Sequence, residues 1–165
     1  MPEFLLLGYV TLERLMEVLW SAHNEAALRA KGAMEHGAEH YPFMVALHAA
    51  WLAGLWVFAW GLPANGWAVA AFALVQGLRF WILTSLGRRW TTRVFVLPGK
   101  PLVGTGPYRW LRHPNYWVVA AEIALVPLAF GLVGYAIVFS LANAVMLAWR
   151  IRVENRALAD VARTR

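Results

Sequence analysis

Apolar segments long enough to cross a bilayer alternate with short polar loops along most of the chain, and this alternation restricts the fold more than any single motif. A helix needs about 20 mostly apolar residues to cross the hydrocarbon core of a membrane. Five segments approach this length, at about 4–22, 43–62, 67–87, 116–131 and 132–150. A polar helix over about 151–163 follows them. The pattern predicts an all-α integral membrane bundle of about five transmembrane helices plus a cytoplasmic C-terminal helix, in a single domain over 1–165.

The positions of lysine and arginine support five spans and orient them. Cytoplasmic loops of membrane proteins carry an excess of these two residues. Thirteen of the fifteen lysines and arginines lie between the first and second segments, between the third and fourth, or after the fifth. Five spans place these three stretches on one side of the membrane. We therefore expect the N-terminus outside and the C-terminus in the cytoplasm.

The net charge of +6 does not indicate a nucleic-acid-binding protein. Hydrophobic residues make up 61% of the chain and charged residues 15%, below the roughly 25% of an ordinary soluble domain. The cations occupy the gaps between apolar segments, whereas a basic groove needs a polar folded surface to display it. We therefore expect the lipid bilayer as a partner and no nucleic acid. Because the chain has no cysteine, disulfides and thiolate metal sites are excluded.

Several polar side chains lie inside the predicted spans, where they are costly unless they pair or line a wet cavity. Arg14 and Glu17 are three residues apart and can pair on one helix face. Either this pair neutralises a packing helix, or Glu17 forms part of the polar wall of a site. Glu122 either pairs with Arg14 or Arg79, or helps to line a cavity. Arg79 lies close enough to the basic loop to reach the cytoplasmic interface, and we expect a structural role for it. We expect His48 to be a hydrogen-bonded packing residue.

The end of the fifth segment places three polar residues on one helix face. Asn143, Arg150 and Glu154 return to the same side of a helix with 3.6 residues per turn. A solvated interfacial helix that contacts anionic lipid head groups would explain the arginines of this region. It would not explain an acidic residue among them, so a binding site near Glu154 is the other interpretation.

The stretch "GPYRWLRHPNYW", from Gly106 to Trp117, concentrates cations and aromatic rings before the fourth segment. Pro114 is well placed as the first residue of that helix, whose free N–H groups would then face the loop. Arg112 and His113 stand just before it and complete a site suited to a carboxylate or phosphate. The alternative is an aromatic belt at the membrane interface combined with the cytoplasmic excess of positive charge.

Two motifs together, "LVGTGPYRWLRHPNYW" over 102–117 and "RIRVENRAL" over 150–158, resemble the isoprenylcysteine carboxyl methyltransferase family. The family pattern is "GPY…RHPxY" followed by "RIxxEExxL". The matching residues are Gly106, Pro107, Tyr108, Arg112, His113, Pro114, Tyr116, Arg150, Ile151, Glu154 and Leu158. The segment "ERLMEVLWSAHNEAALRAKGAMEHGAEHYPFMVALH" is similar to a bacterial branch of the family, associated with type III polyketide synthases and with O-methylation of alkylpyrones.

The resemblance implies S-adenosylmethionine as cofactor, bound near the cytoplasmic face without a metal. The implied cofactor-binding residues are Gly106, Tyr108, Arg112, His113, Pro114, Tyr116, Arg150, Glu154 and Asn155. Asn155 departs from the family pattern, because a second glutamate is usual there, and Val118 stands where many members have glycine. Arg112 and Glu154 are the candidates for a catalytic role, although no base is assigned. The candidates for lining the substrate site are Glu17, Trp117, Glu122 and Asn143.

The expected function is methyl transfer in a bacterial cell membrane, from S-adenosylmethionine to a carboxylate or enol oxygen of a lipophilic acceptor. A prenylated cysteine and an alkylpyrone are both compatible with this chemistry. The alternatives are a membrane lipid reductase that uses NADPH, a phospholipid N-methyltransferase, and a non-catalytic protein that binds anionic lipids. The cofactor that binds distinguishes these functions: a methyltransferase would bind S-adenosylmethionine, the reductase would bind NADPH, and the non-catalytic protein would bind neither.

Overall fold

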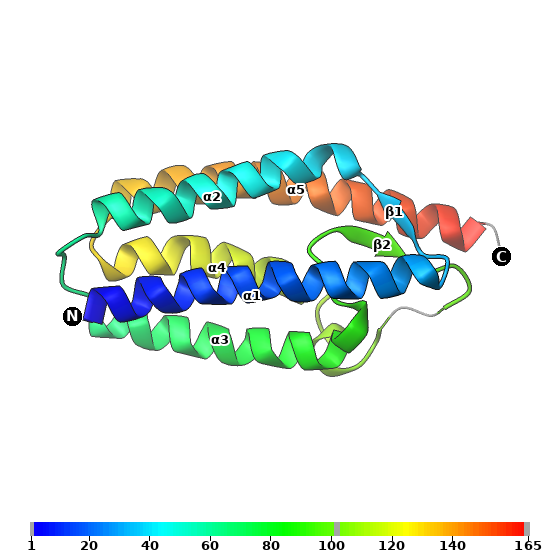
Figure 1. Ribbon diagram of the computed structural model, residues 1–165, viewed down its shortest axis with the longest axis horizontal. Helices are drawn as coiled ribbons and strands as arrows, with labels where there is room; N and C mark the ends of the chain where they lie inside the picture. The colour runs from blue at the N-terminus through cyan, green and yellow to red at the C-terminus, as the bar shows by residue number, and fades with distance from the viewer. Residues whose placement is uncertain (1, 101–102, 164–165) are drawn as a thin grey trace.

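The computed structural model describes residues 2–100 and 103–163, which form a bundle of long α-helices lying side by side (Figure 1). The bounds of the five helices are α1 Pro2–Ala30, α2 Tyr41–Phe58, α3 Gly66–Leu86, α4 Pro114–Ala129 and α5 Val133–Arg163. The predicted all-α class is confirmed. α4 packs against both α3 and α5, and α2 packs against α5.

Most of the expected helix bounds are close to the observed ones, and two differ. The first helix continues to Ala30, well past residue 22. The polar helix expected over 151–163 is not separate but forms the last part of α5. No proline or glycine follows Gly134 in the chain, so nothing in the sequence interrupts the helical backbone after the apolar part. α4 begins at Pro114, as predicted.

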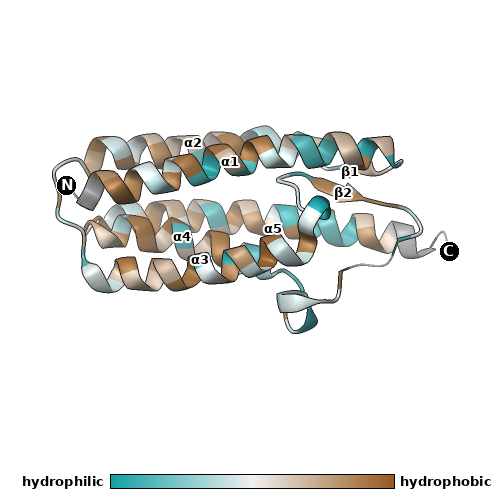
Figure 2. Cartoon of the chain, turned by 60° about the horizontal axis from the view of Figure 1, so that its bottom comes forward, coloured by the Kyte–Doolittle hydropathy of each residue, from teal (hydrophilic) through white to brown (hydrophobic). Residues whose placement is uncertain are grey.

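Three described helical stretches are long and apolar enough to cross a membrane: Ala38–Phe58, Gly66–Arg89 and Val133–Ala159. α4 is a shorter apolar helix, and α1 carries Glu13, Arg14 and Glu17 among its apolar residues. Apolar residues predominate along the bundle (Figure 2). These features are those of an integral membrane protein, while the number of five spans stays a prediction.

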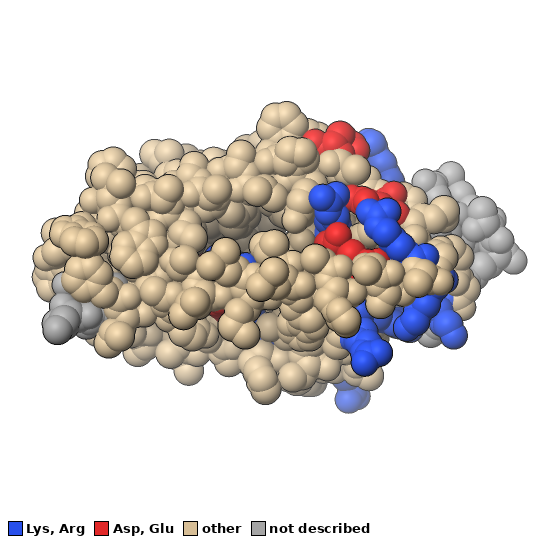
Figure 3. Space-filling view, viewed as in Figure 1, with Lys and Arg blue, Asp and Glu red and all other residues tan. Residues whose placement is uncertain are grey.

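A short antiparallel sheet, which the sequence did not predict, joins two loops at one end of the bundle. Strand β1 covers Met34–His36 and pairs with β2, Val94–Val96. Three single-turn 3-10 helices accompany it: η1 Ala38–His40, η2 Gly87–Arg89 and η3 Gly106–Arg109. The cationic loops and the C-terminal part of α5 lie at this end (Figure 1). On the face shown in Figure 3, the charged side chains gather there.

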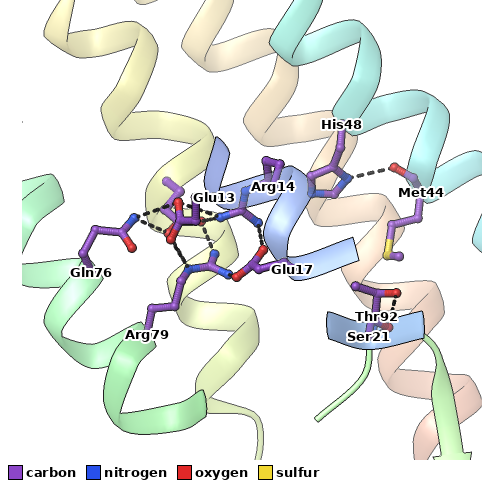
Figure 4. A network of polar contacts seen from close by, with 10 residues as sticks. Glu13, Arg14, Glu17, Ser21, Met44, His48, Gln76, Arg79 and Thr92 are labelled. Carbon is purple, nitrogen blue, oxygen red and sulfur yellow. Dashed lines mark hydrogen bonds and ion pairs between the residues drawn. The ribbon is translucent and has the colours of Figure 1, made fainter. Parts of the chain in front are cut away.

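A cluster of charged side chains lies in the middle of the bundle and links α1, α3 and α4 (Figure 4). Its members are Glu13, Arg14, Glu17, Gln76, Arg79 and Glu122. Arg79 is 2% exposed and pairs with both Glu17 and Glu122. Arg79 therefore does not extend to the cytoplasmic interface, because carboxylates from two neighbouring helices hold its guanidinium inside. Pairing with an arginine was one of the two alternatives for the Glu122 carboxylate, and it is the one observed.

Arg14 is the second cation of the cluster. Its Nη1 lies 2.8 Å from a Glu17 carboxylate oxygen and its Nη2 lies 2.8 Å from Glu122. The predicted pair of Arg14 with Glu17 is confirmed, and Glu122 pairs with both arginines. Gln76 donates a hydrogen bond of 2.8 Å to Glu122. The cluster thus satisfies charges that would be costly to bury alone.

Replacing Arg79 with methionine should destabilise the bundle strongly, because the Glu17 and Glu122 carboxylates would lose a buried partner. Breaking a buried ion pair typically costs about 3–5 kcal/mol. Thermal unfolding of the purified protein in detergent measures the effect as a lower Tm. Arg88→Met, which changes an exposed arginine of η2, is the matched control and should unfold like the wild type. Equal Tm values for the two variants would show that the cluster does not hold the helices together.

Candidate active site

A cavity lies at the charged end of the bundle, and we call it the end cavity. It has a volume of about 470 Å³ and is enclosed by the loop between α3 and α4, by β2, by the start of α4 and by the last part of α5. Small-molecule sites commonly have volumes of about 300–1,000 Å³. Its polar lining includes Tyr108, Arg112, His113, Tyr116, Glu154 and Asn155.

A second cavity of about 260 Å³ lies between α1, α2, α4 and α5, and we call it the lateral cavity. Leu15 and Val18 of α1 and Val45 of α2 line it and are also exposed on the surface of the protein. The lateral cavity therefore opens between α1 and α2. The surface in Figure 3 is hollowed between these two helices. In a membrane this opening would face the hydrocarbon.

The two cavities adjoin each other. Trp90, Asn115, Tyr116 and Arg150 line both of them. A molecule in the end cavity and a molecule in the lateral cavity would both touch these side chains. The arrangement can therefore bring together a polar ligand at the charged end and an apolar ligand from the bilayer.

A chain of hydrogen bonds at the base of the end cavity connects α4 with α5. The Tyr116 hydroxyl donates to Glu154 Oε2 at 2.5 Å, and Arg150 Nε donates to the Tyr116 hydroxyl oxygen at 3.0 Å. His113 Nδ1 lies 3.5 Å from the same Glu154 oxygen, and the His113 ring stacks on the Tyr116 ring. The two motifs are thus joined side chain to side chain.

Arg150 is also fixed from its other side. Its Nη1 donates to the Thr92 carbonyl oxygen at 2.6 Å and contacts Met44 Sδ at 3.3 Å. The side chain is buried and connects α5 with α2 and with the loop that precedes β2. Arg150 therefore holds the wall between the two cavities in place.

The electrostatics of the end cavity favour a charged His113. A hydrogen bond to the Glu154 carboxylate raises the pKa of the His113 imidazole above its ordinary value, although burial and the nearby Arg112 guanidinium act in the opposite direction. Burial, with a smaller contribution from Glu154, raises the pKa of the Tyr108 hydroxyl, which therefore remains a hydrogen-bond donor. The site presents the Arg112 guanidinium and the partly buried Glu154 carboxylate to a ligand.

Two buried polar atoms in the wall of the end cavity have no hydrogen-bond partner among the described residues. They are Trp90 Nε1, a donor, and Asn115 Oδ1, an acceptor. Buried polar groups in folded proteins are nearly always paired, so unpaired ones call for a ligand or water. The cavity is therefore suited to a molecule that carries both donors and acceptors.

The structure brings together most of the residues predicted to bind a cofactor. Tyr108, Arg112, His113, Tyr116, Arg150, Glu154 and Asn155 all line the end cavity. Gly106 and Pro114 do not line it. Gly106 has a φ of +60°, and a Cβ there would lie 2.1 Å from Ser85 Oγ, so it shapes the loop and its packing. Pro114 begins α4 and sets the direction of the helix.

Two of the four residues predicted to line the substrate site do line a cavity, and two do not. Glu17 and Asn143 line the lateral cavity. Glu122 lies in the ion cluster and is not part of the lining of either cavity. Trp117 is 67% exposed and points away from both cavities, because its position on α4 faces outward. Glu17 is therefore both a cluster member and a cavity residue.

The sequence did not point to several residues of the cavity walls. Asn115 stands inside the "RHPNY" motif, and its amide could have been proposed from that position. Trp90 and Thr92 belong to a loop without a recognisable pattern, and Met44 is an ordinary apolar residue of α2. His48, expected to pack through a hydrogen bond, does bond to the Met44 carbonyl oxygen at 2.8 Å but also lines the lateral cavity.

Comparison with known proteins agrees with the two motifs. The model of the isoprenylcysteine carboxyl methyltransferase (ICMT) family matches residues 68–160. The uncharacterized protein YpbQ of Bacillus subtilis (strain 168) is 38% identical over 162 residues, covering 95% of this chain and 96% of YpbQ. An uncharacterized protein of Haemophilus influenzae is 27% identical over 110 residues, covering 59% of this chain and 60% of that protein. No solved structure gives a significant match.

Removing the Glu154 carboxylate should lower the pKa of His113. In Glu154→Gln, burial and Arg112 still disfavour the imidazolium, and the contact with Asn155, the smallest of these influences, is the one that still favours it. NMR titration of histidine-labelled protein in detergent measures the pKa, and the His113→Gln spectrum assigns the signal. Because the folded-state pKa is raised, the stability that this contact contributes is present at low pH and is lost as pH rises through that pKa.

Glu39→Gln, which changes an exposed carboxylate of η1, is the control for this titration and should leave the His113 pKa unchanged. A His113 pKa that is the same in Glu154→Gln and in the wild type would contradict the contact between His113 and Glu154.

Proposed function

The chain belongs to the isoprenylcysteine carboxyl methyltransferase family, and on that premise we propose that it transfers a methyl group from S-adenosylmethionine to an oxygen of a lipophilic acceptor. The family implies a membrane methyltransferase. The observation that carries the finer proposal is the pair of adjoining cavities, one polar and at the charged end, the other open toward the bilayer. Such a pair suits a water-soluble donor and a membrane-dissolved acceptor.

The groups in the end cavity fit S-adenosylmethionine. The cofactor has a carboxylate, an ammonium, a sulfonium, ribose hydroxyls and an adenine ring. His113 and Arg112 stand at the N-terminus of α4, where a carboxylate is favoured by the cations and by free backbone N–H groups. Glu154 suits the ammonium or a ribose hydroxyl. The unpaired Trp90 Nε1 and Asn115 Oδ1 supply a further donor and acceptor.

S-adenosylmethionine supplies a methyl group activated for displacement at its sulfonium. The residues of this chain contribute binding and orientation. Holding two reactants in contact can account for about 7–11 kcal/mol of a reaction barrier. Tyr116 and Arg150 lie between the cavities and are fixed by mutual hydrogen bonds, so they can define the meeting point of donor and acceptor.

The acceptor belongs in the lateral cavity. Its opening between α1 and α2 is bordered by Leu15, Val18 and Val45, which suit an alkyl or prenyl tail that remains in hydrocarbon. The reactive oxygen would reach Tyr116 and Arg150. A prenylated cysteine and an alkylpyrone both meet these requirements, and a phospholipid would reach the opening in the same way.

The end cavity is proposed to face the cytoplasm, where S-adenosylmethionine is made available to enzymes. The cations of the loops and of the end of α5 support this orientation. A reporter enzyme that is active only in the cytoplasm, fused to the C-terminus, tests this orientation and should be active. An inactive reporter would show that the orientation is the reverse of the one proposed.

Two substitutions should weaken the binding of S-adenosylmethionine. His113→Ala removes an imidazole and Glu154→Gln removes a partly buried carboxylate of the end cavity. Losing a hydrogen bond to a charged group costs about 1.5–3 kcal/mol, or roughly 10- to 150-fold in affinity. Calorimetric titration of the purified variants measures the change. Arg152→Ala, which alters an exposed arginine of α5 outside the cavity, should bind like the wild type. Unchanged affinity in both site variants would refute the assignment.

A further inference from the structure

The lateral cavity is lined by polar side chains although it lies among the apolar helices of the bundle. His48 of α2, Asn143 of α5 and Arg14 of α1 all contribute to its wall. An alkyl or prenyl chain cannot form hydrogen bonds with these groups. They therefore indicate the chemistry of the acceptor's polar head group and not of its tail.

His48 lines this cavity, and one of its two ring nitrogens is bonded within α2. Its Nδ1 lies 2.8 Å from the Met44 carbonyl oxygen, as Figure 4 shows. A carbonyl oxygen only accepts, so the uncharged imidazole carries its proton on Nδ1 and keeps a lone pair on Nε2. The charged groups that act on this ring are Arg14 of α1, Glu122 of α4 and Arg150 of α5.

Asn143 adds a second unused acceptor. The residue is 1% exposed and lines the lateral cavity. Its Oδ1 is buried and has no hydrogen-bond partner among the described residues. An amide oxygen can only accept, so the missing partner is a hydrogen-bond donor. A carboxylate has no hydrogen to give, whereas a hydroxyl or an enol does.

Arg14 does not make the cavity a site for an anion. Its Nη1 is engaged by Glu17, and its Nη2 by Glu122 and more distantly by Glu13. The cluster to which it belongs combines these three carboxylates with two guanidinium groups, Arg14 and Arg79. The remaining cation of the lateral cavity, Arg150, already donates to the Tyr116 hydroxyl and to the Thr92 carbonyl oxygen. Because the cluster holds one more carboxylate than guanidinium groups, the cluster and Arg150 together carry no excess of positive charge, and an uncharged head group is favoured.

Given the methyl transfer proposed above, we propose that the acceptor is a long-chain hydroxyl compound that binds with its hydroxyl proton still attached, and that His48 Nε2 is the base that removes this proton. Such a compound is a phenol, an enol or an alcohol. The oxygen forms a bond to the methyl carbon while the carbon–sulfur bond of the sulfonium breaks. The electron pair of that bond stays on sulfur, which becomes a neutral thioether. The hydroxyl proton moves to His48, and the positive charge passes from sulfur to the imidazolium.

The test compares two acceptors of equal chain length in His48→Asn. Asparagine can keep the hydrogen bond from its amide nitrogen to the Met44 carbonyl oxygen, but it lacks the proton acceptor at Nε2. One acceptor is a dodecyl phenol, un-ionised near pH 7, and the other is its dinitrated analogue, whose two nitro groups make it acidic enough to be ionised at that pH. Methylation of the phenol should fall by about 10²–10⁴-fold, the usual contribution of a general base. Methylation of the dinitrophenolate should change little.

Binding of S-adenosylmethionine, measured on the same samples, reports whether each variant is folded. His48→Asn should bind it as the wild type does, and His23→Gln, which alters an exposed histidine of α1, should retain both activities. If His48→Asn fails to bind, His48→Gln replaces it in the same comparison. Failure of the wild type to bind S-adenosylmethionine would overturn the proposed function itself. Three results would overturn only the role of His48. They are a wild type that binds S-adenosylmethionine but does not methylate the phenol, a His48→Asn variant that loses methylation of both acceptors equally, and a His48→Asn variant that loses neither.

Discussion

The ion cluster between α1, α3 and α4 is the constraint on which the rest of this structure depends. Charges inside a bilayer are tolerated when they pair, and here Arg79 is held by acidic groups from two other helices. α1 contributes Glu13, Arg14 and Glu17 to the cluster, so its place in the bundle is set by these pairs. Since α1 also forms one side of the lateral cavity, the cluster fixes the shape of that cavity as well.

Two alternative functions can be weighed against this arrangement. A non-catalytic protein that binds anionic lipids would need exposed arginines such as Arg152 and Arg156, which α5 does carry. It would have no need of a carboxylate that is held by Tyr116 and His113 inside a cavity. A lipid reductase would use the same two cavities with NADPH in place of S-adenosylmethionine. The match to a methyltransferase family favours the latter cofactor.

Much of the helical fold and of the end cavity could be predicted from the sequence, because both depend on local patterns. Apolar length gave the helices, Pro114 gave the start of α4, and the two motifs supplied the chain from His113 to Glu154. The lateral cavity could not be predicted in the same way. Its wall combines side chains from all five helices, whose packing depends on the ion cluster. The sequence left open whether Arg79 reaches the interface or pairs with Glu122, because its partners lie on other helices.

The central claim is that a cofactor in the end cavity meets a tailed acceptor in the lateral cavity. Its most direct test is the transfer of labelled methyl from S-adenosylmethionine to a series of acceptors that differ only in chain length, with the protein in nanodiscs. Each buried methylene contributes about 0.8 kcal/mol to partitioning, so at equal low concentration the long acceptors should be methylated far better than the short ones. Equal turnover of short and long acceptors, or no transfer to any of them, would contradict the account.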